Sequence, residues 1–357
     1  MLKRLLVISF LGIIFLSVGP SFAGQRSSVV ISEFIFSRAL LDAPFCHAPT
    51  IAQTSSGLVV AWFGGSWEGN ADTKIFLSRK GFGSKDWSSP QMVAQGRDKD
   101  GPRASWNPVL FSQTNGPLFL FYKIGKAPSS WQGMFIFSLD QGQTWSPPHR
   151  LPDGIIGPAK NKPVELDKGV VLFPSSAESF DSWRIFIESI RPHSPDDFLL
   201  RANWSVTGPL NDRALMVIQP TLLDFGGGDI LLLSRHKQPN PFLPQSIMEA
   251  RSMDDGHTWS QLKLTDLPNP NSGIDAVVLK DGRCVLVYNP TRLKRTPLDV
   301  AISNDQGKTW RPLLRLENGF GEYSYPSVIQ SADGMIHIVY TWQRRKIKHV
   351  VLDPRLI

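Results

Sequence analysis

The sequence predicts an all-β protein, a six-bladed β-propeller that an N-terminal strand closes. Three observations predict it: a unit of two apolar strands joined by a turn recurs six times, an Asp-Gly turn motif recurs beside these units, and the last unit is cut short by the end of the chain. Helical periodicity is nearly absent, and 29 Gly and 28 Pro residues indicate many short strands and turns.

Each repeat unit opens with an apolar strand that has Pro or Ala near its start, as in "IQPTLLDFGGGDILLLSR". These leading residues recur at intervals of 50 to 59 positions. A period of about 50 residues with four short strands per unit is typical of a propeller with one blade per repeat. The six leading residues are Pro49, Pro108, Pro163, Pro220, Ala276 and Pro326.

The sixth unit has room for only three strands between Pro326 and Ile357. We expect the segment "SVVISEFIF", residues 28–36, to supply the missing outer strand, which would close the ring and cover both sheet edges. No Pro/Gly/Ser-rich linker divides the chain, so we predict a single domain over residues 24–357 in spite of its length.

An octet of the pattern S-x-D-x-G-x-T-W occurs three times, at 138–145, 252–259 and 303–310. The residue types suit a hairpin turn, because Ser and Asp bond nearby backbone groups, Gly adopts a positive φ and Trp packs on the sheet. We interpret these motifs as structural. The alternative is metal binding by Asp140, Asp254 and Asp305, but each turn offers few carboxylates.

The first 23 residues have the composition of a secretory signal peptide. Lys3 and Arg4 precede an apolar stretch from Leu5 to Val18, and a small-residue site ends at Ala23. The alternative is an uncleaved anchor, but the stretch is shorter than the ~20 residues that span a bilayer. We therefore expect export to the periplasm or the medium, with no stable membrane insertion after cleavage.

The formal net charge of +7 is mildly basic, and no Lys/Arg-rich block is interleaved with aromatic residues. Nucleic acid is therefore not an expected partner, whereas an anionic ligand is compatible with this charge. No cluster has zinc spacing and no EF-hand-like loop occurs, so we expect neither metal nor cofactor. Cys46 and Cys284 could pair in an exported protein, but free buried thiols are the preferred interpretation.

The first strands of all blades run the same way along a propeller axis, so the residues at their starts meet at one mouth of the channel. In this sequence those residues are polar or aromatic, unlike the strands that they precede. A convergent polar ring at a concave mouth is the default ligand site. The ring comprises His47, Trp106 with Asn107, Asn161 with Lys162, Gln219, Asp275, and Tyr323 with Tyr325.

With its repeats and its Asp-containing turn motifs, known as Asp boxes or BNR repeats, the sequence resembles the sialidase superfamily over residues 28–357. It is most similar to a branch of predicted bacterial neuraminidases. The resemblance implies three arginines that clamp a sugar carboxylate. The segment "QPTLLDFGGGDILLLSR" nominates Arg235 and "RTPLDVAISNDQGKTW" nominates Arg295, whereas "FCHAPTI" places His47 where the remaining arginine would be.

The resemblance also implies a nucleophilic tyrosine, which "EYSYP" matches with Tyr323, while Tyr325 could serve only for packing. The general acid would be Asp72, with Glu68 as a substitute, in "GSWEGNADTKIFLSR". The glutamate that activates the nucleophile is replaced by Gln219. A tyrosine with a pKa of ~10 needs an adjacent base, and Gln219 cannot take a proton.

Three functions stay open at this point. The first is an exo-glycosidase, and hence a hydrolase, acting on a terminal anionic sugar such as sialic acid or a uronate. The second is a polysaccharide lyase or rhamnosyl-glucuronate-cleaving enzyme that uses His47 and Tyr323 as acid and base. The third is a non-catalytic glycan-binding propeller. In each, the partner is a glycan that carries a carboxylate, and the further candidate sugar contacts are Gln219, Asp275, Asn107, Lys162 and Tyr325.

Overall fold

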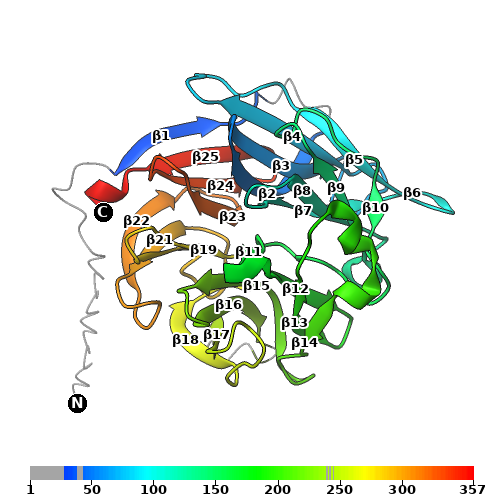
Figure 1. The fold of residues 1–357 in the computed structure, drawn as a ribbon. Coiled ribbons are helices and arrows are strands. Elements are labelled where there is room, and N and C mark those ends of the chain that lie inside the picture. Colours follow the sequence, from blue (N-terminus) through cyan, green and yellow to red (C-terminus); the bar gives the residue numbers. More distant parts are fainter. Residues whose placement is uncertain (1–27, 38–42, 239, 241–242, 244) are drawn as a thin grey trace, which may run out of the picture.

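The computed structural model describes residues 28–37, 43–238, 240, 243 and 245–357, so the predicted leader lies outside the described residues. Six antiparallel sheets follow one another around a central axis (Figure 1). The six-bladed β-propeller predicted from the sequence is therefore confirmed. No helix among the described residues is long and apolar enough to cross a membrane.

Blade one comprises β2 (Phe45–Thr54), β3 (Gly57–Gly65), β4 (Lys74–Gly81), β5 (Gln91–Asp98) and β6 (Gly101–Arg103); blade two comprises β7 (Ser105–Ser112), β8 (Leu118–Ile124), β9 (Gln132–Ser138) and β10 (His149–Arg150); blade three comprises β11 (Val164–Glu165), β12 (Val171–Glu178), β13 (Trp183–Ile190) and β14 (Ser205–Thr207).

Blade four comprises β15 (Met216–Asp224), β16 (Ile230–Lys237), β17 (Ser246–Ser252) and β18 (Lys263–Pro268); blade five comprises β19 (Asp275–Val278), β20 (Cys284–Tyr288), β21 (Leu298–Ser303) and β22 (Arg311–Glu317); blade six comprises β23 (Tyr323–Gln330), β24 (Ile336–Trp342), β25 (Lys346–Leu352) and β1 (Val29–Phe34). The described helices are 3-10 turns at Pro128–Ser130, Asp167–Gly169, Pro195–Leu199, Arg201–Asn203 and Pro354–Leu356.

The ring closes as the sequence predicts, because β1 pairs with β25 as the outer strand of blade six. Figure 1 shows β1 beside β25, and β23 lies next to the inner strand of blade one, β2. Apolar side chains from adjacent blades fill the space between the sheets, and one such cluster includes Tyr340 of blade six and Val300 of blade five. Cys46 and Cys284 are buried free thiols in two of these clusters.

The Asp boxes are hairpin turns whose carboxylates bond their own loop. Asp254 accepts hydrogen bonds from the Thr258 amide (2.8 Å), the Thr258 hydroxyl (2.6 Å) and the Ser252 hydroxyl (2.8 Å). Asp140 and Asp305 repeat this arrangement. Ser252 pairs with Ile230, the first residue of β16, and Ile230 pairs with Asp224, the last residue of β15. This Asp box therefore lies at the end of blade four opposite the start of β15, its first strand.

Four first strands share a bulge directly before a proline. The pairing shifts register between His47 and Thr50 in β2, and the residue inside the bulge has a positive φ, as do its counterparts in three other blades. A bulge turns a side chain away from the regular alternation of the strand. The residues with positive φ are Ala48 (50°), Asn107 (38°), Gln219 (55°) and Tyr325 (53°), each followed by proline.

A buried polar network holds the closing strand. Glu33 of β1 accepts hydrogen bonds from Lys80 (2.8 Å) and Trp87 (2.9 Å) of blade one and contacts His349 Nδ1 of β25 at 2.9 Å. His349 Nε2 in turn contacts His337 Nδ1 at 3.0 Å. Burial acts to raise the pKa of Glu33, but the hydrogen bonds outweigh it and lower this pKa to about 2.

Replacing Glu33 by Gln should lower the free energy of unfolding at pH 7 by about 2 kcal/mol, because a charge-assisted cluster is lost at the closure. The folded-state pKa of about 2 lies below the ordinary value of 4.5. The carboxylate therefore stabilises the fold above pH 4.5, and this contribution disappears as the pH falls toward 2. Urea unfolding at pH 7 and pH 3 measures both effects. The difference in the free energy of unfolding between wild type and Glu33→Gln should be smaller at pH 3 than at pH 7.

The control is Asp212→Asn, which changes an exposed acid and should alter stability by less than about 0.5 kcal/mol. If wild type and Glu33→Gln differ in free energy of unfolding by the same amount at both pH values, the charge of Glu33 does not hold the ring closed.

Candidate active site

Arg235, at the end of β16, is the centre of the site. Its side chain is buried, with 6% exposure, and its guanidinium lies between the rings of Trp183 and Tyr325, 5.7 Å from each centroid. Nη1 donates to the Tyr325 hydroxyl (2.7 Å) and to Oε1 of Gln219 (3.1 Å), whereas the buried Nε has no partner. Among the described residues, no carboxylate oxygen lies within 4.0 Å of this guanidinium.

An unpaired buried charge is costly, and proteins normally pair it or use it to bind an ion of opposite sign. The aromatic rings offset part of this cost, since a cation over a ring face is attracted by its quadrupole. The orphan Nε still lacks an acceptor. The arrangement around Arg235 is therefore that of a site for an anion.

Two further arginines approach from blades five and six. Arg295 lies with its guanidinium 5.5 Å from the centroid of the Tyr325 ring and pairs with Oε1 of Glu322 at 2.9 Å. Arg344 donates from Nε to the other oxygen of Glu322 (2.9 Å) and also pairs with Glu68. Glu322 thus holds Arg295 beside the ring of Tyr325 and Arg344 beside the ring of Phe45, and the charge of Arg344 is already balanced.

Tyr325 and His47 form the aromatic part of the site. Their ring centroids are 4.2 Å apart, and Nδ1 of His47 lies 2.9 Å from the Thr341 hydroxyl. Burial lowers the pKa of His47 well below its usual value, and the charges of Arg344, Arg295, Arg235 and Lys160 lower it further. His47 is therefore a neutral imidazole at pH 7, and it stays so until an anion offsets the nearby positive charge.

The structure places Tyr323 differently from Tyr325. The ring of Tyr323 packs against Trp342 at 6.2 Å within the apolar cluster between blades five and six. Its hydroxyl lies 3.4 Å from the Phe320 carbonyl and 3.5 Å from the Gln343 amide nitrogen. The bulge before Pro326 turns Tyr325, and not Tyr323, toward Arg235. The tyrosine that the geometry offers for chemistry is therefore Tyr325.

A buried lysine that the sequence analysis did not single out crosses the centre of the propeller. Lys160 Nζ donates to Asn161 Oδ1 (2.8 Å), to the Ile274 carbonyl (3.0 Å) and to the Pro326 carbonyl, so it joins blades three, five and six. Burial lowers the pKa of Lys160 to about 7, although the charge of Asp275 acts to raise it. Lys160 lies 6.0 Å from the ring centroid of Tyr325.

The loop that carries Lys160 replaces most of an inner strand, since β11 has only two residues. Buried charged groups fix this loop. Glu188 accepts from the amides of Ile156 (2.9 Å) and Gly157 (2.7 Å), and Lys123 donates to the Pro158 carbonyl (2.6 Å). The position of Lys160 is thus set by hydrogen bonds from the neighbouring strands.

Three other predicted ligand contacts serve as cross-links between blades. Asp275 is fully buried and accepts from Lys162 (2.9 Å), the Thr221 hydroxyl (2.8 Å) and the Val328 amide (2.8 Å). Asn107 donates to the Ala159 carbonyl at 3.0 Å. The polar groups of Asp275, Lys162 and Asn107 are therefore satisfied within the protein, and we do not retain them as sugar contacts.

Glu178, at the end of β12, is a second group that the sequence analysis missed. Burial raises the pKa of its carboxyl, and the charge of Glu68 acts in the same direction. The charge of Arg235 and a hydrogen bond with Gln219 act to lower this pKa but do not outweigh burial. Its Oε1 is buried without a partner. A buried carboxyl with a raised pKa thus lies beside Gln219, the residue that stands where a glutamate was expected. Its place at the end of a second strand, outside the ring of first-strand residues, explains why no motif revealed it.

Asp72 is exposed, and its carboxylate accepts from the Ser66 amide (2.9 Å) and the Ser66 hydroxyl (3.0 Å). These bonds are those of a turn. The neighbouring acid in the same loop, Glu68, is paired with Arg344. Both loop carboxylates are therefore bonded to protein groups in this structure, whereas Oε1 of Glu178 has no partner.

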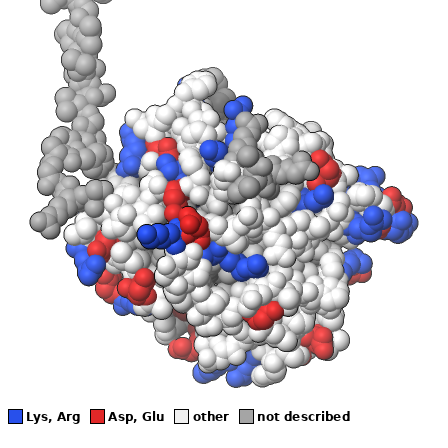
Figure 2. All heavy atoms as spheres, turned by 90° about the horizontal axis from the view of Figure 1, so that it is seen from above, with Lys and Arg blue, Asp and Glu red and all other residues white. Residues whose placement is uncertain are grey.

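The positive charge of the site is buried inside the propeller. On the face drawn in Figure 2, basic and acidic side chains are interspersed over most of the described surface instead of gathering by sign. Arg235 and Lys160, by contrast, are 6% and 4% exposed. The site thus favours a small anionic group that enters the mouth over a large polyanion that lies on the surface.

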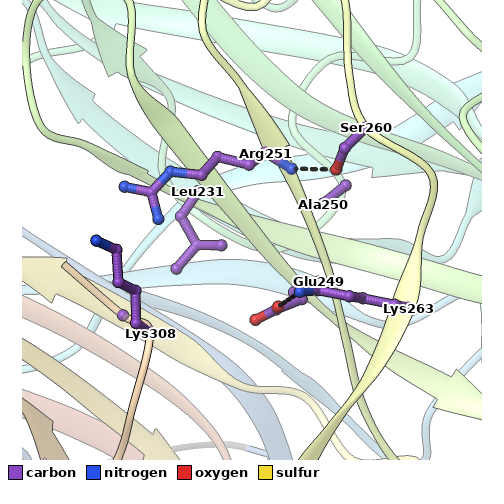
Figure 3. Close-up of a pocket in the computed structure, with 8 residues that line it drawn as sticks. Leu231, Glu249, Ala250, Arg251, Ser260, Lys263 and Lys308 are labelled. Carbon is purple, nitrogen blue, oxygen red and sulfur yellow. Dashed lines mark hydrogen bonds and ion pairs between the residues drawn. The ribbon is translucent and has the colours of Figure 1, made fainter. Parts of the chain in front are cut away.

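A different pocket, of about 200 Å³, lies between blades four and five (Figure 3). Its charged side chains are largely paired: Arg251 with Asp229 at 2.5 Å, and Lys263 with Glu249 at 3.0 Å. The pocket contains Gly307 and Lys308 of an Asp box, so it lies away from the mouth that Arg235 lines. Paired charges and this location make it a weaker candidate than the central cluster.

The sequence profile of a BNR repeat-like domain matches residues 56–338. No curated protein matches the sequence. Among solved structures, the Hadza microbial sialidase Hz136 is similar with a TM-score of 0.75 and 16% identity, over 92% of this chain and 69% of that chain. The leech intramolecular trans-sialidase has a TM-score of 0.70 and 13% identity, over 92% and 71%.

The NanB sialidase from Streptococcus pneumoniae has a TM-score of 0.66 and 11% identity, over 88% of this chain and 69% of that chain. At these identities the likeness of the solved structures shows the fold. The sialidase-like propeller expected from the Asp boxes is confirmed, and the chain belongs to the BNR repeat-like domain family.

Proposed function

We propose that this protein binds and cleaves glycans that end in an acidic sugar, such as sialic acid or a uronate, and that Arg235 and Arg295 hold the sugar carboxylate. The observation that carries this proposal is the buried guanidinium of Arg235, which has an orphan Nε and no carboxylate partner among the described residues. Guanidinium groups bind carboxylates through paired N–H donors, so a sugar carboxylate is the matching ligand.

The carboxylate would settle beside Tyr325, because both arginines lie next to that ring. Arg235 donates a hydrogen bond to the Tyr325 hydroxyl at 2.7 Å, and such a donor stabilises negative charge that develops on the oxygen. The phenolic oxygen would attack the anomeric carbon as the bond from that carbon to the leaving oxygen breaks, and the phenolic proton would pass to His47, the neutral imidazole whose ring centroid lies 4.2 Å from that of Tyr325.

The leaving oxygen needs a proton when the glycosidic bond breaks, and water must later add to the sugar carbon. Glu178, whose pKa burial raises above the ordinary value of a carboxyl, would give this proton and, as the resulting carboxylate, would take one from water in the second step. Asp72 is the other candidate acid, since the resemblance assigns it this role, but its oxygens are bonded to Ser66. We therefore assign the proton transfer to Glu178 and the nucleophile to Tyr325.

Lyase chemistry on a uronate is the second candidate. His47 is a neutral imidazole 4.2 Å from Tyr325 and close to several cations. Arginines that neutralise a uronate carboxylate would acidify the neighbouring C–H bond, and the same carboxylate would offset the charges that lower the pKa of His47. The imidazole could then take the proton while Tyr325 protonates the leaving oxygen.

A turnover screen separates these functions. We expect release of the fluorophore from 4-methylumbelliferyl sialoside, or new reducing ends from a rhamnosyl-glucuronate disaccharide, without the ultraviolet absorbance of an unsaturated sugar. Arg235→Ala should abolish this turnover, and His47→Ala should reduce it less. New absorbance with uronate polymers would favour the lyase, and binding without any turnover would favour a glycan-binding propeller.

Removing the two tyrosine hydroxyls one at a time tests the assignment of Tyr325. Tyr325→Phe should lower kcat by at least about 10²-fold, because the group that reacts with the sugar is lost. Tyr323→Phe removes only contacts of 3.4 Å and 3.5 Å at the rim and should change kcat less than about threefold. A larger loss of kcat in Tyr323→Phe than in Tyr325→Phe would instead identify Tyr323 as the nucleophile.

The pH dependence of kcat tests Glu178. Its raised pKa means that the protonated, active form persists above the usual range of a carboxyl, so kcat should fall as the pH rises through this pKa. Glu178→Gln should lower kcat and remove this alkaline decline from the residual activity. An unchanged pH profile in Glu178→Gln would exclude Glu178 as the acid.

A further inference from the structure

The ammonium group of Lys160 uses every hydrogen-bond donor that it has on the protein itself. An ammonium has three N–H donors, and the three acceptors are Oδ1 of Asn161 (2.8 Å), the Ile274 carbonyl (3.0 Å) and the Pro326 carbonyl. The side chain is 4% exposed, so no donor is left for a ligand. None of these acceptors is a carboxylate, and two of them are backbone carbonyls that belong to blades five and six.

The two carbonyls belong to the chain segments that meet at the ring of Tyr325. Pro326 directly follows Tyr325, and Ile274 directly follows Gly273. The backbone of Gly273 lies against the tyrosine ring, since a Cβ added there would be 3.3 Å from Cγ and Cδ2 of Tyr325 and 3.4 Å from Cε of Lys160. One ammonium thus bonds both the chain that carries this ring and the chain that packs on it.

The conformation of Tyr325 needs support from outside its own strand. Its φ of 53° lies in the left-handed region, which is costly for a residue with a side chain. The pairing with β24 shifts register between Ser324 and Ser327, so a regular ladder does not hold this part of β23. Such a conformation persists only where the surroundings fix it, and the bond from Lys160 to the next carbonyl in the chain contributes to this.

Asn161, the next residue in the loop, holds the equivalent bulge of blade four. Its amide nitrogen donates to the carbonyls of Gln219 (3.1 Å) and of the proline that follows (3.0 Å). Gln219 also has a positive φ, of 55°, and its side chain and that of Tyr325 are the two acceptors of Arg235 Nη1. The adjacent residues Lys160 and Asn161 therefore hold both of the bulges that supply these acceptors.

We propose that Lys160 is a positioning residue: its ammonium fixes the backbone that carries Tyr325 and the backbone that packs on its ring, and so sets where the phenolic oxygen lies. The sugar carboxylate is left to Arg235 and Arg295, so loss of the ammonium should lower kcat and leave KM nearly unchanged. This inference rests on the proposed function for the chemical role of Tyr325. The position of the ring can nevertheless be measured in the absence of any turnover.

Fluorine NMR of the full chain labelled with 3-fluorotyrosine reports on the surroundings of Tyr325. The chain has five tyrosines, so five signals are expected, and single Tyr→Phe variants assign them. Lys160→Met keeps an unbranched side chain but removes the ammonium, and it should shift or broaden the Tyr325 signal more than any of the other four. With 4-methylumbelliferyl sialoside, kcat should fall at least about tenfold and KM should stay within about threefold of wild type, because small displacements of a reacting group slow the chemical step.

Gly273→Ala tests the same arrangement in a protein that keeps Lys160. The added methyl would lie 3.3 Å from two atoms of the Tyr325 ring, so the ring must move by a few tenths of an ångström. Gly273 does not have a positive φ, and alanine is therefore compatible with its backbone. The Tyr325 signal should shift, and kcat should fall at least about threefold at nearly unchanged KM.

The matched control is Lys348→Met, which removes a half-buried ammonium in blade six. Nζ of Lys348 and the hydroxyl of Tyr340 both bond Oε1 of Glu317 at 2.7 Å. This variant should therefore shift the Tyr340 signal and leave both the Tyr325 signal and kcat unchanged.

An unchanged Tyr325 signal in folded Lys160→Met would overturn the positioning role, and so would a rise in KM at unchanged kcat. If Lys160→Met does not fold, an unchanged Tyr325 signal in Gly273→Ala would overturn it. If the Tyr325 signal shifts in these variants while wild type cleaves no acidic sugar, the positioning role stands and the proposed function fails.

Discussion

The buried guanidinium of Arg235 is the interaction on which the site depends. The protein gives it two aromatic faces, a tyrosine hydroxyl and an amide oxygen, but no carboxylate among the described residues. Such a cation raises the free energy of the empty site, and an anionic ligand would lower it. The same charge helps to keep His47 neutral and acts on the carboxyl of Glu178. The titration of both groups is therefore coupled to the charge of one side chain.

The propeller explains how this arrangement is maintained. Lys160 and Asp275 tie the blades to one another across the axis, and Glu33 ties the closing strand to both of its neighbours. These cross-links satisfy polar groups that would otherwise be buried without partners. With the inner strands fixed, the bulges before the prolines can aim residues such as Gln219 and Tyr325 at one point.

The repeat architecture could be predicted from the sequence because its signals are local: five of the six units open with a proline-led strand, and three of the six carry an Asp-box turn. Arg235 and Arg295 could be nominated because the segments around them resemble motifs of the sialidase superfamily, and both guanidinium groups lie beside the ring of Tyr325. The choice between Tyr323 and Tyr325 depended on a bulge, although the sequence held a clue: Asn107, Gln219 and Tyr325 all directly precede the repeat proline. Glu178 and Arg344 lie at the end of a strand and in a turn, where only the packing of the blades brings them to the mouth.

Determining the structure with an acidic monosaccharide bound, N-acetylneuraminic acid or glucuronic acid, tests the central claim most directly. We expect a carboxylate oxygen to accept a hydrogen bond from Nε of Arg235, the second arginine at this carboxylate to be Arg295, and the sugar to lie against Tyr325. A saturated crystal in which the sugar carboxylate lies elsewhere, with Arg235 still contacting only Gln219 and Tyr325, would contradict it.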